Sequence, residues 1–102
     1  MKRYTTPTVA LRITDDGAAE LLAAATSATL SAEGTRGRVD VAAQVDGASV
    51  RTTLTQAQTA RLGAGPVKWE ATLRFADGTV VKTKTVESTV DEAVLRREVG
   101  DA

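Results

Sequence analysis

Residues 38–55 read RVDVAAQVDGASVRTTLT, and this stretch carries the clearest structural signal in the chain. Apolar residues take every second position from Val39 to Val45, which is the period of a strand with one buried face. Asp46-Gly47 is a preferred pair for a two-residue turn in which both residues have positive φ. That turn sets Val45 opposite Ala48, and the apolar face agrees with the register. We therefore predict a β-hairpin here.

A second hairpin is predicted further along the chain. Residues from Val67 to Phe75 alternate between apolar and polar, and Asp77-Gly78 turns the chain into the stretch 79–88. A two-residue loop at this turn would set Lys82 and Lys84 beside the core face. The register of this hairpin therefore stays open, and a bulge at Gly78 would resolve the conflict.

Two further segments precede the hairpins. Residues 7–14 alternate as a strand does, with Val9, Leu11 and Ile13 on one side. Residues 18–25 are rich in alanine and leucine and can be either helix or strand; a short helix or turn over about 16–24 is favoured, capped by Asp15 or Asp16, with a strand over 26–32.

Two short helices are expected in the second half of the chain. Thr55 and Gln58 have the spacing of a capping box, and Gly63 supplies a stop, so a helical turn is predicted between the two hairpins. Residues 91–99 are predicted to form a C-terminal helix, with acidic residues near its start and Arg96 and Arg97 near its end.

These elements predict one mostly β domain that spans residues 1–102. About six to seven short antiparallel strands, two aspartate-glycine turns and two short helices are typical of a β-sandwich, and a small barrel is the alternative.

Composition excludes several function classes. The 102 residues contain 13 basic and 13 acidic side chains, so the basic excess of a nucleic-acid-binding protein is missing. Histidine and cysteine are absent, which removes the commonest general base, the cysteine nucleophile and the usual zinc ligands. No apolar run is long enough to cross a membrane or to serve as a signal peptide. We therefore expect a soluble protein with no enzymatic activity, no catalytic, metal or cofactor-binding residues, and no nucleic-acid or membrane partner.

The remaining candidate side chains have structural explanations. Asp15, Asp16, Asp46 and Asp77 stand at or near glycines, where aspartate favours turns. Arg74, Lys82 and Lys84 form a small basic patch that suits a solvated face or a protected edge strand. Trp69 is expected in the core, which leaves Tyr4 as the one aromatic ring available to a ligand.

Two stretches resemble small proteins encoded by bacteriophages and prophages. The first is residues 3–11, RYTTPTVAL; the second runs from Thr53 through Gly65, Val67, Trp69 and Leu73 to Asp77-Gly78 and Val86. The second pattern is similar to immunoglobulin-like sandwich domains of phage tail and baseplate proteins. The resemblance covers about half of the chain, and the alanine-rich residues 18–25 depart from it.

The resemblance implies a structural or assembly role in a virion. A tail, neck or baseplate component, or an assembly factor, would work through contacts with itself or with other virion proteins, as a homo-oligomer or in a complex. It would be found in the cytoplasm of a bacterial host or in the virion. The alternative is a module that binds a small ligand or carbohydrate, for which Tyr4 would be the contact.

Overall fold

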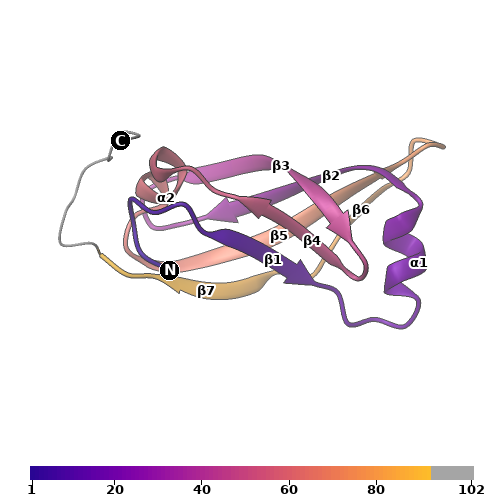
Figure 1. The fold of residues 1–102 in the computed structure, drawn as a ribbon, viewed down its shortest axis with the longest axis horizontal. Coiled ribbons are helices and arrows are strands. Elements are labelled where there is room, and N and C mark those ends of the chain that lie inside the picture. Colours follow the sequence, from indigo (N-terminus) through magenta and orange to yellow (C-terminus); the bar gives the residue numbers. More distant parts are fainter. Residues whose placement is uncertain (93–102) are drawn as a thin grey trace.

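The computed structural model describes residues 1–92, which form seven strands and two helices. In chain order these are β1 (Thr8–Arg12), α1 (Ala18–Ala23), β2 (Ala25–Glu33), β3 (Arg38–Asp46), β4 (Ser49–Thr53), α2 (Gln56–Leu62), β5 (Gly65–Phe75), β6 (Val80–Lys82) and β7 (Val86–Val90) (Figure 1).

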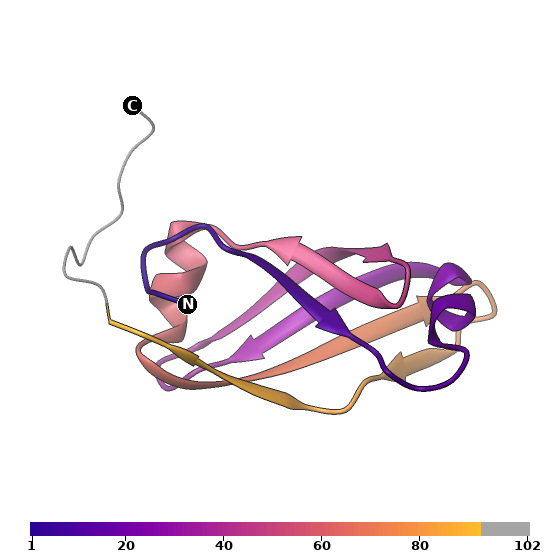
Figure 2. The ribbon, with the colours of Figure 1, turned by 60° about the horizontal axis from the view of Figure 1, so that its bottom comes forward.

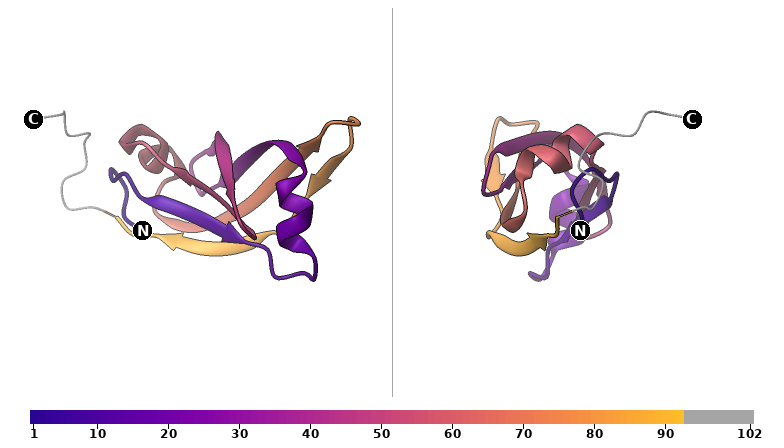
Figure 3. Two further views of the ribbon diagram at one scale, coloured as in Figure 1. Left: turned by 45° about the vertical axis from the view of Figure 1, so that its right-hand side comes forward. Right: turned by 90° about the vertical axis from the view of Figure 1, so that its left-hand side faces the viewer.

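The strands form one antiparallel sheet in the order β1-β4-β3-β2-β5-β6, and β7 pairs with the first part of β5. The sheet curls because β3 changes partner along its length: residues 38–43 pair with β2, and residues 44–46 pair with β4. Viewed along its length, the sheet is a half-barrel (Figure 3, right). The predicted mostly β fold is confirmed, and the two-layer immunoglobulin-like sandwich is not.

The β3–β4 hairpin forms, but its predicted register is wrong. Val45 pairs with Val50 and Asp46 with Ser49, so the loop consists of Gly47 and Ala48. Gly47 has a φ of 59°, and Asp46 is not among the residues of positive φ. Positive φ at the first central residue alone is typical of a type II′ turn, which needs glycine at that position. The apolar face survives because the register differs by two residues, the period of a strand.

The open register of the second hairpin is resolved by a longer loop. Leu73 pairs with Val81 and Thr72 with Lys82, and the amide of Phe75 donates to the carbonyl of Thr79. Three residues, 76–78, therefore connect the strands, with Gly78 at a φ of 89°. This is the loop in which a glycine in the left-handed region makes a bulge. The predicted bulge is confirmed, and it puts Lys82 on the outer face.

The ambiguous residues 18–25 are mostly helical. Helix α1 covers Ala18–Ala23 and buries Ala18 and Leu22, and β2 begins directly after it. The predicted capping by Asp15 or Asp16 is wrong, because the N-cap is Gly17 and no side chain caps the helix. The backbone carbonyl of Asp15 accepts from the amide of Ala18 instead.

Helix α2 forms as the sequence predicts. Thr55 is the N-cap, its capping box with Gln58 is complete in both directions, and Gly63 is the C-cap. The predicted C-terminal helix, residues 91–99, falls outside the described residues for all but its first two positions. Its expected first residue, Asp91, forms an isolated parallel bridge with Lys2.

The core lies inside the curl and is closed at its two ends by the helices (Figure 1). Its largest fully buried apolar residues come from both helices and from four of the strands or their ends: Leu22, Leu30, Val50, Leu54, Leu62, Val67, Leu73 and Val90. Trp69 is 8% exposed, as expected for a core residue. Neither helix of the described part is long and apolar enough to cross a membrane.

Candidate binding groove

The half-barrel leaves a groove between β1 and β7, which we call the open seam. β1 pairs only with β4, and β7 pairs only with β5, so each strand presents a free edge to the other (Figure 2). The two strands run in opposite directions, because Met1–Arg3 runs parallel to β7 and the chain then reverses into β1. They are the two edges that a closed barrel would join.

Two hollows lie along the open seam and share Leu11 and Val86. The first has a volume of about 290 Å³ and an apolar lining of Met1, Val9, Leu11, Leu30, Trp69 and Val86, with Ala10 and Ser88. The second has a volume of about 430 Å³ and continues toward α1. Its apolar lining includes Ile13, Leu21 and Val81, and its charged rim consists of Arg12, Asp15, Lys82 and Lys84.

Val86 shows that the seam is an uncovered part of the core. Residues opposite each other in an antiparallel pair lie on the same face, so Val86, opposite the inward-facing Trp69, faces inward too. Val90 lies on the same face of β7 and is 1% exposed, whereas Val86 is 46% exposed. Both side chains lie on the same face of the same strand, so the larger exposed fraction of Val86 means that no other part of the protein covers it there. Leu21 on α1 is similarly 45% exposed at the edge of the second hollow.

The free edge of β1 presents unpaired backbone groups to the seam. The amide of Leu54 donates to the carbonyl of Pro7, and the amide of Ile13 donates to the carbonyl of Ala48. Hydrogen-bonded pairs alternate in an antiparallel ladder, so the odd-numbered residues of β1 bond to β4. The amides and carbonyls of Thr8, Ala10 and Arg12 therefore point to the open edge. Such a row is a template for another strand.

The free edge of β7 is covered at one end by the N-terminal segment. The amide of Arg3 donates to the carbonyl of Asp91 at 2.9 Å, and the amide of Asp91 donates to the carbonyl of Met1 at 2.6 Å. The side chain of Arg3, 10% exposed, donates to the carbonyl of Ala60 and pairs with Glu92 at 3.1 Å. We call these contacts of Met1 and Arg3 the N-terminal clamp. The clamp closes the seam at the α2 end, and the sequence did not predict it.

The ring of Tyr4 already contacts the side chain of Arg3. It lies 5.1 Å from the guanidinium carbon of Arg3, a cation–π contact, and the side chain is partly buried. Tyr4 is thus part of the N-terminal clamp, which weakens the alternative in which this ring is a free platform for a carbohydrate.

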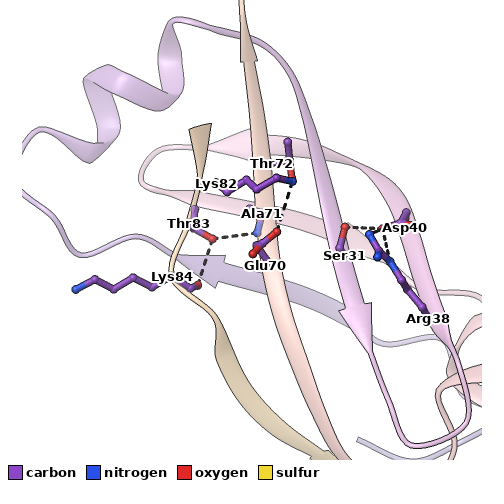
Figure 4. A network of polar contacts seen from close by, with 9 residues as sticks. All are labelled: Ser31, Arg38, Asp40, Glu70, Ala71, Thr72, Lys82, Thr83 and Lys84. Carbon is purple, nitrogen blue, oxygen red and sulfur yellow. Dashed lines mark hydrogen bonds and ion pairs between the residues drawn. The ribbon is translucent and has the colours of Figure 1, made fainter. Parts of the chain in front are cut away.

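The outer face of the sheet carries a polar network that includes one side chain of the predicted basic patch, Lys82 (Figure 4). Lys82 lies 3.6 Å from Glu70 and donates to the hydroxyl of Thr72, so its charge is matched. Lys84 extends away from the other labelled side chains. Arg74 is exposed on β5. The three cations therefore do not act together as one patch.

Ser31 and Asp40 form a second polar contact on the outer face. Ser31 Oγ donates to Asp40 Oδ1 at 2.6 Å, and the guanidinium of Arg38 lies 3.2 Å from the same oxygen. The bond from Ser31, and then that from Arg38, holds the pKa of Asp40 below its ordinary value. A carboxylate stabilised in this way is a poor base for activating a serine. Both partners of this ion pair are largely exposed, so the network adds little stability.

The aspartates at the predicted turns act locally. Asp77 Oδ1 accepts from the amide of Thr79 at 2.9 Å, and this backbone bond lowers the pKa of Asp77. Asp46 pairs with Arg51 across the β3–β4 hairpin at 3.0 Å. Among residues 1–92, no three acidic side chains are grouped so that they could hold a metal ion.

The structure defines a class: a mostly β protein whose single antiparallel sheet curls into an incomplete barrel with an apolar open seam. No protein-family model matches the chain, and no curated protein or solved structure matches it significantly. The residues of the seam are therefore the basis of the functional argument.

Proposed function

We propose that this protein is a non-enzymatic interaction protein that binds an extended segment of a protein partner in the open seam. The observation that carries the proposal is the combination of a free strand edge on β1 with an uncovered apolar interior at Val86. Main-chain hydrogen bonds to an exposed edge supply affinity in this mode of recognition, and alternate side chains supply specificity.

The cellular setting of this activity comes from the resemblance alone. Similarity of residues 3–11 and 53–86 to immunoglobulin-like tail and baseplate proteins supports a (pro)phage origin, with a virion or assembly protein as the partner. A strand supplied by a neighbouring protein would complete the half-barrel, which suits a component that works by contact. Genes for capsid, tail-tube or tape-measure proteins beside this gene would support the setting.

Selection of peptides on the intact protein tests the binding mode. A library of random twelve-residue peptides is selected on the full chain, and the enriched peptides are measured by fluorescence anisotropy. We expect sequences that alternate between apolar and polar residues. Val86→Arg, which places a charge in the seam, should weaken their binding by about tenfold or more, since it removes apolar contact and buries a charge.

The matched control is Val80→Arg. Val80 is 52% exposed, like Val86, but it pairs with Arg74 and so faces the outer side of the sheet. Binding to this variant should be unchanged, and circular dichroism of both variants checks that they fold. Failure to enrich any peptide, or equal binding to Val86→Arg and Val80→Arg, would contradict the proposal.

A further inference from the structure

The two ends of the open seam differ in their charged groups. The hollow beside Met1 has no ionisable side chain in its lining, and the N-terminal ammonium of Met1 already donates to the carbonyl of Thr89 at 3.1 Å. The hollow toward α1 has Arg12, Lys82 and Lys84 on its rim, against Asp15 as the one acid. Lys82 is already paired with Glu70, whereas neither Arg12 nor Lys84 takes part in an ion pair among residues 1–92. Two uncommitted cations thus mark the α1 end.

The two edges of the seam also differ. Residues 89–91 at the end of β7 are already bonded to the N-terminal segment, through Met1 and Arg3. The edge of β1 has outward backbone groups at Thr8, Ala10 and Arg12, and none of these backbone groups is bonded within residues 1–92. β1 therefore offers a longer free edge than β7 to a strand that enters the seam. Antiparallel pairing is the more stable arrangement per residue.

Together these differences give the occupant a polarity. A strand antiparallel to β1 begins beside Arg12 and ends beside Thr8. We infer that the partner segment adds antiparallel to β1, turns alternate apolar residues toward Leu11 and Val86, and carries carboxylates at its N-terminal end, opposite Arg12 and Lys84. This inference rests on the proposed function and names the chemistry of its partner.

A second copy of this chain fits the same place less well. If two copies paired through their β1 edges, Thr8 of one copy would lie opposite Arg12 of the other, because the strands run in opposite directions. That arrangement offers no carboxylate to Arg12. Charge complementarity therefore favours an acidic segment of another protein.

Three synthetic peptides test the polarity. Each alternates valine with threonine over seven residues; one adds two aspartates at its N-terminal end, one adds them at its C-terminal end, and one has two asparagines at the N-terminal end. We expect the first to bind the full chain about fivefold more tightly than either of the others. Raising the salt concentration should reduce this preference, because the rim is solvent-exposed.

Two variants attribute the preference to the rim. Arg12→Gln and Lys84→Gln should each reduce the advantage of the first peptide, and together they should abolish it. Lys68→Gln is the matched control, because Lys68 is an exposed lysine outside both hollows of the seam, and it should leave the preference intact.

The outcomes separate this inference from the proposed function. If all three peptides bind equally and Val86→Arg weakens all of them, the polarity is wrong and the seam remains a binding site. If no peptide binds the full chain, both fail. If the protein sediments as a dimer that Arg12→Gln dissociates, and no peptide competes with it, the occupant is a second copy and the acidic partner is excluded.

Discussion

At the scale of single residues, Arg3 makes the most consequential polar contacts. Its Nε and Nη2 atoms lie 3.2 and 2.7 Å from the carbonyl oxygen of Ala60, and Nη1 pairs with Glu92. Ala60 stands in the last turn of α2, where a cation is favoured, and its carbonyl also accepts from the amide of the C-cap Gly63 at 3.2 Å. Thr59 adds a second link, because its hydroxyl donates to the carbonyl of Thr5 at 3.0 Å. The N-terminal segment is thereby fixed to α2.

We expect Arg3→Ala to lower the free energy of unfolding by about 2–3 kcal/mol, because it removes charge-assisted hydrogen bonds from a buried position. Arg3→Lys should recover only part of this loss, since an ammonium group does not provide the planar pair of donors. Guanidinium denaturation followed by Trp69 fluorescence measures both. Arg51→Ala, at an exposed ion pair, should cost less than about 1 kcal/mol. If Arg3→Ala lowers the free energy of unfolding no more than Arg51→Ala does, Arg3 does not fix the N-terminal segment as we infer.

At the scale of elements, the β3–β4 turn gives a test of the corrected register. A Cβ on Gly47 would meet nothing within 4 Å, so the cost of Gly47→Ala comes from its φ of 59° alone. We expect a loss of about 1–2 kcal/mol in the free energy of unfolding. Asp46→Gly distinguishes the two turns: it should stabilise a turn with positive φ at Asp46, and it should not stabilise the observed one. Thermal unfolding of both variants decides between the registers.

Elements set by local chemistry were predictable from the sequence. The capping box of Thr55 and Gln58, the stop at Gly63 and the alternation from Val67 to Phe75 are all confirmed. Strand pairing between distant segments was not, because a period of two residues shows which face is buried but names no partner. The pairing of β7 with the start of β5, and of β1 with β4, therefore could not be foreseen.

The candidate site was missed for the same reason. Val86, Ser88 and Val90 alternate in the sequence, so their shared face was readable, but the exposure of Val86 depends on how far β1 lies from β7. Arg3 gave no local signal either, since its partners Ala60 and Glu92 are far away in the chain. The site exists because the edges of β1 and β7 do not meet, and that depends on the strand topology, which local sequence patterns do not show.

At the scale of the whole molecule, the strands in the middle of the half-barrel are paired on both sides, and the strands at its two edges are free to pair with a partner. β2 and β5 pair along most of their length and have neighbours on both edges, whereas β1 and β7 each have one. Closing the barrel by joining β1 to β7 is opposed at the α2 end, where the N-terminal segment already occupies β7. The molecule therefore keeps a free edge within a folded domain.

Hydrogen exchange measures this free edge residue by residue. In the free protein the amides of Thr8, Ala10 and Arg12 point to the seam, and we expect them to exchange about tenfold or more faster than those of Val9, Leu11 and Ile13, which face β4. The amides of β5 are the internal control, because both edges of that strand are paired. The peptide with N-terminal aspartates should slow the three fast amides selectively. Uniform protection along β1 in the free protein would mean that the edge is already covered, which the open seam does not allow.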